Sequence, residues 1–184
     1  NDVIMLLPTK NRHIYLNRVN DFYKSTDLKL VILDSTPNKY QKDLSNEIDY
    51  LHLPNHNVVD KLRIAIKKYK NYPFIVIGAD DDFTLPRAIM ECVQFLRCND
   101  DYATAQGYFM SYRKKGEFLI RPQYQEMNSL NFSQKDIIER FVNYSKNSGT
   151  TYYSVHRSDI FKKTINGMQK INFEECGLNT FELI

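Results

Sequence analysis

The chain has 184 residues, of which 42% are hydrophobic and 26% are charged, an ordinary composition for one globular domain with a sizeable core. A net charge of +3 is too small to indicate a nucleic-acid surface, so we expect no nucleic-acid partner. Cys92, Cys98 and Cys176 are odd in number and lack CxxC spacing, which supports neither a disulfide framework nor a zinc ribbon and favours a reducing compartment.

The first half of the chain alternates short apolar runs with segments of helical periodicity. Apolar runs bounded by turn residues predict strands, and Asn57 is placed to cap a helix. The expected strands are 3–7, 28–33, 50–53 and 73–77, and the expected helices are 15–25 and 57–69. This βαββαβ order predicts a largely parallel sheet with helices on both faces.

The second half is predicted to contain three helices, a hairpin and a last strand. A helix with Thr84 as its cap and Pro86 in its first turn should bury a stripe of apolar residues from Leu85 to Leu96. The remaining expected elements are a strand over 102–113 that turns into 117–120 as a hairpin, a helix opened by Ser133 with Ile137, Ile138, Phe141 and Val142 facing inward, a strand over 149–155 and a helix over 158–166. Residues 121–132 show the least pattern.

No apolar run is long enough for a signal peptide or a membrane span, so no transmembrane segment is expected. Asn1 is not an initiator methionine, and the chain stops at Ile184 within an apparently helical stretch. We therefore expect one domain of a longer protein, with further domains of the same chain as partners.

Three adjacent carboxylates, Asp80-Asp81-Asp82, follow the strand over 73–77. Strand alternation would point Asp80 and Asp82 to one side and Asp81 to the other. Hard oxygen ligands of this kind suit Mg²⁺ or Mn²⁺, and open α/β sheets bind ligands at the carboxyl ends of their strands. The pattern favours a metal-nucleotide site, with a solvated acidic turn as the alternative.

The chain resembles the family 2 glycosyltransferases with a GT-A fold. Pro8-Thr9-Lys10-Asn11-Arg12 is similar to that family's opening P-x-x-N-R, Asp34-Ser35 follows the second strand as in the family, and Ala79 to Phe83 with Pro86 resembles its D-x-D region. The resemblance covers roughly residues 3–96. It implies a GT-A-like, mostly parallel α/β sheet flanked by helices in a single domain over 1–184, with 1–96 as the nucleotide-sugar-binding half and 97–184 as a truncated acceptor-side half.

The resemblance also implies which residues bind the donor. Pro8, Thr9 and Arg12 would line the nucleotide pocket. Asp34 would accept a hydrogen bond from the base, unless it only forms an Asx-turn. Lys61 and Arg63, on the helix before the acidic strand, are candidates for nucleotide contact or for a solvated helix surface.

The carboxylates would take separate tasks in such a site. Asp80 and Asp82 would hold Mg²⁺ or Mn²⁺ on the diphosphate, and Asp81 would reach the ribose. The cation would neutralise charge on the departing nucleoside diphosphate. His156, after the last strand, is either a further metal ligand or a structural histidine.

An inverting transfer also needs a general base for the acceptor hydroxyl. The family's later E-D motif is missing, and Glu175 and Glu182 are the best candidates in its place. This departure from the pattern keeps a non-catalytic carbohydrate-binding or scaffold module open as an alternative.

The resemblance therefore implies a metal-dependent, inverting glycosyltransferase that uses a UDP- or GDP-linked sugar and a glycan or lipid-linked acceptor. By analogy we expect it to act in surface polysaccharide or glycan synthesis, in the cytoplasm or at the inner face of the membrane. A sugar-phosphate nucleotidyltransferase is the rival enzyme, although its glycine-rich phosphate loop is not evident after the first strand.

Overall fold

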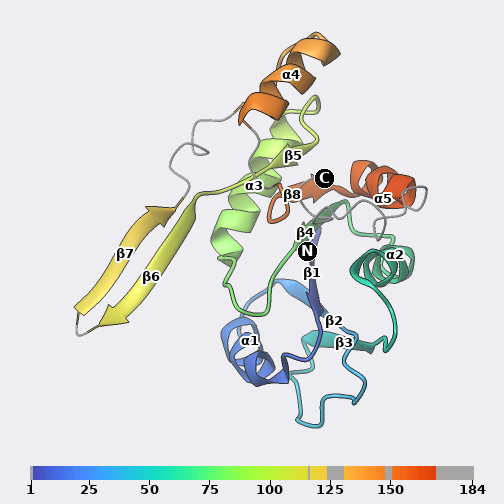
Figure 1. Ribbon diagram of the computed structural model, residues 1–184, viewed down its shortest axis with the longest axis vertical. Coiled ribbons are helices and arrows are strands. Elements are labelled where there is room, and N and C mark those ends of the chain that lie inside the picture. Colours follow the sequence, from blue (N-terminus) through green and yellow to red (C-terminus); the bar gives the residue numbers. More distant parts are fainter. Residues whose placement is uncertain (1, 116, 124–130, 148–150, 169–184) are drawn as a thin grey trace.

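The computed structural model describes residues 2–115, 117–123, 131–147 and 151–168. The chain forms a six-stranded sheet in the order β3-β2-β1-β4-β8-β5 and a separate two-stranded sheet, β6-β7 (Figure 1). The strands are β1 Val3–Thr9, β2 Lys29–Asp34, β3 Ile48–His52, β4 Phe74–Ile77, β5 Thr104–Ala105, β6 Phe109–Lys115, β7 Glu117–Gln123 and β8 Val155–Arg157. The helices are the 3-10 turn η1 His13–Tyr15, α1 Leu16–Tyr23, α2 Val58–Lys68, α3 Pro86–Cys98, α4 Ile137–Asn147 and α5 Ser158–Gly167.

The centre of the sheet is parallel. β1 pairs in parallel with both of its neighbours, so that Leu6 lies opposite Val31 of β2 and Ile77 of β4. β8 is antiparallel to β4, and β5 is antiparallel to β8. The predicted fold class, a mostly parallel sheet flanked by helices with a small antiparallel hairpin in the second half, is confirmed.

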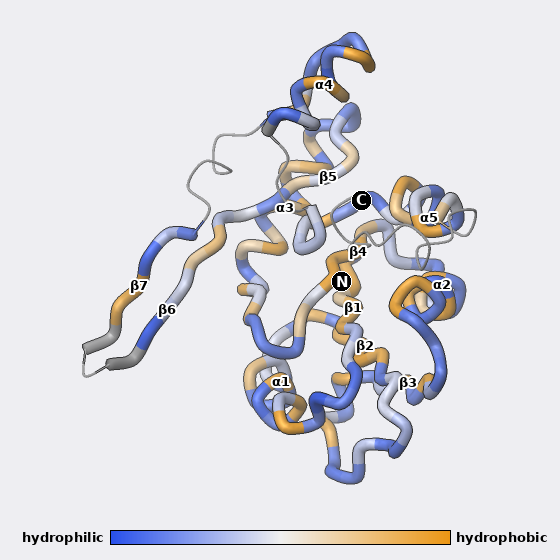
Figure 2. The backbone as a smooth tube through the Cα atoms, viewed as in Figure 1, coloured by the Kyte–Doolittle hydropathy of each residue, from blue (hydrophilic) through white to orange (hydrophobic). Residues whose placement is uncertain are grey.

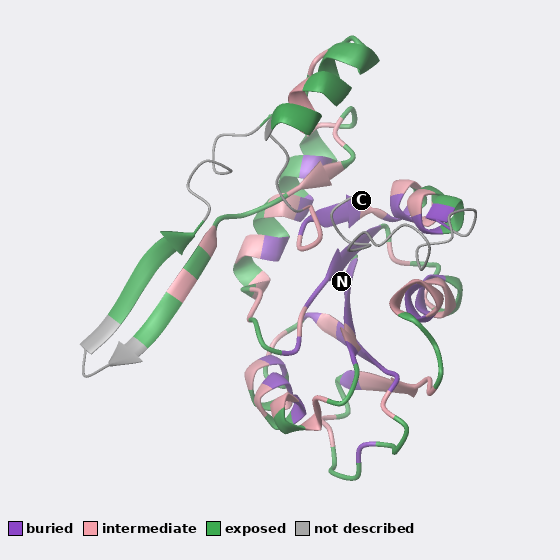
Figure 3. Ribbon diagram, viewed as in Figure 1, coloured by how far each residue is buried: buried purple, intermediate pink, exposed green. Residues whose placement is uncertain are grey.

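Alternation along the strands builds two cores, one on each face of the sheet. Val3, Met5 and Leu7 of β1 pack with α1 and α3, whereas Ile4 and Leu6 pack with α2 and α5. β1 is accordingly hydrophobic along its length in Figure 2 and buried in Figure 3. Because both faces are covered, the strands read as continuous apolar runs in the sequence.

The helix ends are set by local chemistry. The side chain of Asn57 accepts the backbone N–H of Asp60 at 2.9 Å, which confirms Asn57 as the cap of α2. Thr84 does not cap α3, contrary to the prediction. Its backbone N–H instead donates to Oη of Tyr23 at 2.9 Å, and α3 begins with Pro86 at its first positions.

Two predicted strands are shorter than expected. The strand expected over 102–113 is interrupted, because β5, at the edge of the sheet, pairs only with the short strand β8, and regular pairing resumes at Phe109. The strand expected over 149–155 begins only at Val155, since Ser154 donates its backbone N–H to the carbonyl of Thr151 in a turn. Residues 148–150 lie outside the described part of the chain.

The β6-β7 hairpin and α4 extend away from the sheet (Figure 1) and are largely exposed (Figure 3). The predicted inward face of α4 is wrong: Ile137 and Phe141 are 69% and 68% exposed. The helical spacing is present, but no described element packs against that face. None of the helices in the described ranges is both long and apolar enough to cross a membrane.

Candidate functional site

A cavity of about 490 Å³ opens where β1 and β4 end. Strand ends of this kind are where open α/β sheets bind ligands. Seven of the residues expected from the sequence line this cavity, namely Pro8, Thr9, Arg12, Lys61, Asp80, Asp81 and Asp82. Lys10, Val58, Ala79, Tyr152 and Tyr153 complete the lining.

Asp80 is the buried carboxylate of the cavity, with 3% of its surface exposed. Oγ1 of Thr9 donates to its Oδ2 at 2.5 Å, and Nε of Arg12 lies 3.1 Å from its Oδ1. The guanidinium of Arg18 holds the backbone carbonyl of Asp80 at 3.0 Å. Burial raises the pKa of Asp80, although Thr9 and Arg12 oppose the shift.

Arg12 joins the two strand ends by pairing with both Asp80 and Asp81. The turn that brings it there passes through Asn11, whose φ of 57° lies in the left-handed region. Asparagine tolerates this region better than most residues, and Oγ1 of Thr36 holds the Asn11 N–H at 2.8 Å. The positive φ of Asn11 thus forms the turn that brings Arg12 to Asp80 and Asp81.

The three carboxylates do not alternate as predicted. β4 ends at Ile77, and residues 80–82 form a bend rather than a continued strand. All three line the cavity, Asp80 and Asp81 share Arg12, and Asp82 has Oη of Tyr153 at 3.4 Å from its Oδ2. Strand periodicity therefore cannot assign separate sides to them.

The cavity contains carboxylates of the kind that bind Mg²⁺ together with phosphates and water. Within the described ranges, no three His, Cys, Asp or Glu side chains form a group that could hold a metal. Mg²⁺ is usually bound by one or two carboxylates together with phosphates and water. Arg12 already pairs with Asp80 and Asp81, whereas Asp82 is exposed and has no ion pair among the described residues, so Asp82 is the carboxylate most accessible to a cation.

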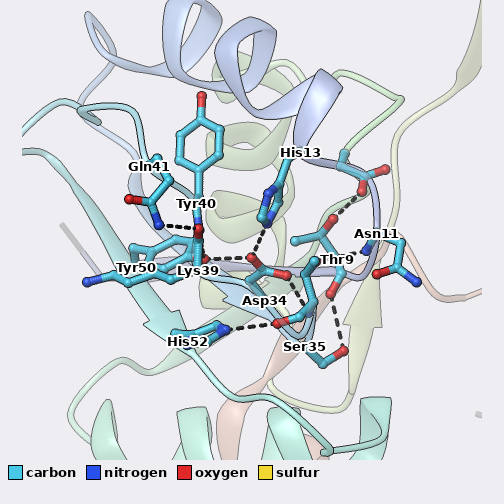
Figure 4. A network of polar contacts seen from close by, with 12 residues as sticks. Thr9, Asn11, His13, Asp34, Ser35, Lys39, Tyr40, Gln41, Tyr50 and His52 are labelled. Atoms are coloured by element: carbon cyan, nitrogen blue, oxygen red, sulfur yellow. Dashed lines mark hydrogen bonds and ion pairs between the residues drawn. The ribbon is translucent and has the colours of Figure 1, made fainter.

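Asp34 lies beneath the surface at the end of β2, and none of its surface is exposed (Figure 4). Its Oδ1 accepts the N–H of Thr36 at 2.8 Å, which is the Asx-turn considered from the sequence. Its Oδ2 accepts from Oη of Tyr50 and from Nε2 of His13, both at 2.6 Å. Burial acts to raise the pKa of Asp34, but these hydrogen bonds outweigh burial and lower it.

This arrangement limits what Asp34 can do. The carboxylate does not line the cavity, and both of its oxygens are occupied by Thr36, Tyr50 and His13. A nucleobase would have to displace His13 or Tyr50 to reach it. The contact between Asp34 and the base stays a prediction.

Lys61 and Arg63 occupy different surroundings. The ammonium of Lys61, 1% exposed, donates to the Thr9 carbonyl at 2.8 Å and to Oγ of Ser35 at 3.1 Å. Burial lowers its pKa to about 8. Arg63 pairs with Asp60 at 2.7 Å and lines a different cavity.

Sequence reasoning missed Arg18, Tyr152 and Tyr153. Arg18 stacks on the rings of Tyr15 and Phe83, at 4.9 and 5.1 Å from their centroids, and so approaches Asp80 from α1. Nothing in the spacing of α1 distinguishes it from a solvated arginine. The two tyrosines lie in a turn before β8, where the sequence predicted a strand.

Three other residues were candidates for a role in the chemistry. Glu175 and Glu182 are outside the described residues, so their role as a base stays a prediction. His156 is 4% exposed, does not line the cavity and packs 5.1 Å from the ring of Phe161. Burial lowers the pKa of His156 to about 4, as for a structural histidine that stays neutral.

No family model matches the chain, and no curated protein sequence matches it. Among solved structures, it is similar to the crystal structure of S. aureus TarS 1-349, with 15% sequence identity and a TM-score of 0.49. The alignment covers 89% of this chain and 49% of that one, so the chain spans about half the length of that structure. A similarity of this size assigns neither a family nor a ligand.

Proposed function

We propose that the chain is the nucleotide-sugar-binding part of a metal-dependent glycosyltransferase, which transfers a sugar from a UDP- or GDP-linked donor to a hydroxyl of a glycan or lipid-linked acceptor with inversion. The observation that carries the proposal is the grouping of Asp80, Asp81 and Asp82 with Arg12 in a cavity at the carboxyl ends of parallel strands. Binding of nucleotides at this edge is the general behaviour of open α/β sheets.

Acidic, basic and aromatic residues of the lining would each bind a different group of the nucleotide-sugar donor. Asp82 would hold Mg²⁺ or Mn²⁺, with Asp80 next to it, and the bound cation would neutralise charge on the leaving diphosphate. Lys10 and Lys61 add positive charge to the lining. Tyr152 and Tyr153 supply aromatic surface, and Oη of Tyr153 steadies Asp82.

Arg12 has a positioning role in this proposal. Its two ion pairs hold the acidic bend against the end of β1, and they offset the repulsion between adjacent carboxylates. Glu175 and Glu182 remain the candidates for the base that accepts the hydroxyl proton.

Calorimetric titration of UDP and GDP with and without Mn²⁺ tests the proposal. We expect Mn²⁺ to tighten the binding of one nucleotide at least tenfold, and Asp82→Asn to abolish this gain. Asp101→Asn is the matched control, because Asp101 is exposed and does not line the cavity. It follows the C-terminal end of α3, where Arg97 pairs with Asp2 just before β1, at the opposite end of β1 from the cavity. Equal binding with and without metal would contradict the proposal.

Hydrolysis of a panel of nucleotide-sugars then tests the donor step. Release of one nucleoside diphosphate in the presence of Mn²⁺, lost in Asp82→Asn, supports a transferase. Nucleotide binding without turnover of any donor in a chain that includes its natural flanking sequence would favour the non-catalytic module instead.

A further inference from the structure

A second cavity, of about 390 Å³, lies between α2 and α5 on one face of the sheet. The two helices run side by side there (Figure 1), and their apolar sides meet through Leu62, Phe161 and Ile165. The cavity is lined by Arg63, Ile66, Lys67, Lys70, Lys162 and Asn166. It shares no lining residue with the cavity at the strand ends.

Helical spacing explains why these side chains gather. Arg63, Lys67 and Lys70 are four and three positions apart, so they follow one side of α2 and its C-terminal turn. Lys162 and Asn166 are four apart on α5. The packing of α2 on α5 brings both sets to one groove.

The groove carries four positive side chains and no acidic one. Arg63 has an ion pair with Asp60, whereas Lys67, Lys70 and Lys162 form none with an acidic residue of the described ranges. Nζ of Lys162 instead donates to the carbonyl of Lys70 at 3.4 Å. Like charges at these spacings repel and destabilise a helix, so an anion in the groove would relieve an existing cost.

Arg63 adds a second observation. Its Nη1 binds Asp60, but its Nε is buried and has no hydrogen-bond partner among the described residues. A buried donor without a partner costs free energy. Arginine pairs with phosphate through parallel N–H donors, and lysine adds a point charge.

The volume and the apolar lining of the groove restrict the class of ligand that it can bind. A volume of 390 Å³ corresponds to about a dozen water molecules, which is more than one free phosphate requires. Ile66, 7% exposed, and the methylene stems of the lysines provide apolar surface beside the charges. A phosphate ester or diphosphate with part of its organic substituent matches this lining.

We propose that the groove between α2 and α5 is a binding site for a phosphate-bearing anion, separate from the cavity at the strand ends. The same chemistry is found in a soluble phosphate ester and in the headgroup of an anionic lipid, and the two sources are distinguished by experiment. The site does not depend on the function proposed for the carboxylates.

The first test is a titration of ¹⁵N-labelled protein with sodium pyrophosphate at constant ionic strength, with EDTA present to keep metal out of the other cavity. We expect saturable shifts of the backbone amides of Ile66, Lys67, Lys162 and Asn166. The double variant Lys67→Gln/Lys162→Gln should weaken binding at least tenfold, and Lys42→Gln, at an exposed lysine outside the lining, should not.

Shifts confined to Thr9 and Asp80, the absence of saturable shifts, or equal binding by the double variant would overturn the proposal. Far-UV circular dichroism verifies that the double variant is folded. Binding of UDP or GDP with Mn²⁺ by the double variant should equal that of the unaltered protein, so failure of one proposal leaves the other open.

The second test separates the two sources of phosphate by co-sedimentation with vesicles. Binding to phosphatidylglycerol vesicles but not to phosphatidylcholine vesicles, lost in the double variant, assigns the site to a lipid headgroup. Pyrophosphate binding without vesicle binding assigns it to a soluble phosphate ester. Absence of both overturns the site.

Discussion

Tyr50→Phe should destabilise the protein through the buried carboxylate of Asp34. The phenol of Tyr50 donates to Oδ2 of Asp34 at 2.6 Å and accepts the backbone N–H of Tyr40 at 3.0 Å. Phenylalanine keeps the ring but removes both hydrogen bonds. Asp34 is fully buried, so water cannot replace the lost donor.

The magnitude follows from these two bonds. A hydrogen bond to a charged group contributes about 1.5–3 kcal/mol and a neutral one about 1 kcal/mol, so we expect a loss of about 3 kcal/mol in the free energy of unfolding at pH 7. The effect should depend on pH, because the hydrogen bond from Tyr50 helps to lower the pKa of Asp34 in the folded state. A lowered carboxyl pKa stabilises the fold above the unfolded pKa, and that stability is lost as the pH falls through the folded pKa.

Urea unfolding followed by far-UV circular dichroism at pH 7, 5 and 4 measures this loss. The difference between Tyr50→Phe and the unaltered protein should be largest at pH 7 and should begin to shrink near pH 4. Tyr102→Phe is the control, since its exposed phenol makes only long contacts with Asn131, donating at 3.5 Å and accepting at 3.4 Å, and it should cost less than about 0.5 kcal/mol. A loss below 0.5 kcal/mol in Tyr50→Phe, at an unchanged denaturant slope, would refute the reasoning.

Three further predictions test other parts of the structure. Burial lowers the pKa of Lys61 to about 8, so the unfolded chain holds more protons than the folded one between about pH 8 and 10.4, and the free energy of unfolding should rise with pH there. Urea unfolding at pH 7.5–9.5 should therefore show a weaker dependence of this free energy on pH in Lys61→Met than in the unaltered protein. The same pH dependence in both would contradict this. Asn11→Gly should preserve stability, whereas Asn11→Val should lose about 1–2 kcal/mol because its φ is positive; equal thermal unfolding of the two variants would show that the turn is not strained. Leu96→Ala, at a fully buried position of α3, should cost about 2–5 kcal/mol, but Phe141→Ser on α4 less than about 0.5 kcal/mol, as compared by urea unfolding; a large cost at Phe141 would mean that its ring is covered.

The parts of the fold that the sequence predicted depend on local information. The strand of residues 3–7 is apolar throughout because both faces of β1 are covered, and Asn57 caps α2 through its own side chain. The position of Asp80 to Asp82 at a strand end was also predictable, since the apolar run stops just before them. These features require only the chain within a few residues of each position.

The errors arose where distant segments decide the outcome. The apolar stripe of α4, with Ile137 and Phe141, has helical spacing, but no described element covers it. The sides of the three carboxylates were set by the bend after β4 and by Arg12, which lies far away in the sequence. Asp34 is bound by Tyr50 of the neighbouring strand and by His13, which the sequence did not predict, and its contact with a base stays a prediction.

Lys61 and Arg63, two positions apart on α2, were both candidates for nucleotide contact, but they line different cavities. Two positions along a helix correspond to a rotation of roughly 200°, so their side chains leave α2 on different sides and line different cavities. If both proposals hold, Lys61→Met should weaken nucleotide binding measured with Mn²⁺ and leave pyrophosphate binding in EDTA unchanged, and Arg63→Met should do the reverse. A variant that weakened both equally would mean that the charges act through the general field of the protein rather than through two separate sites.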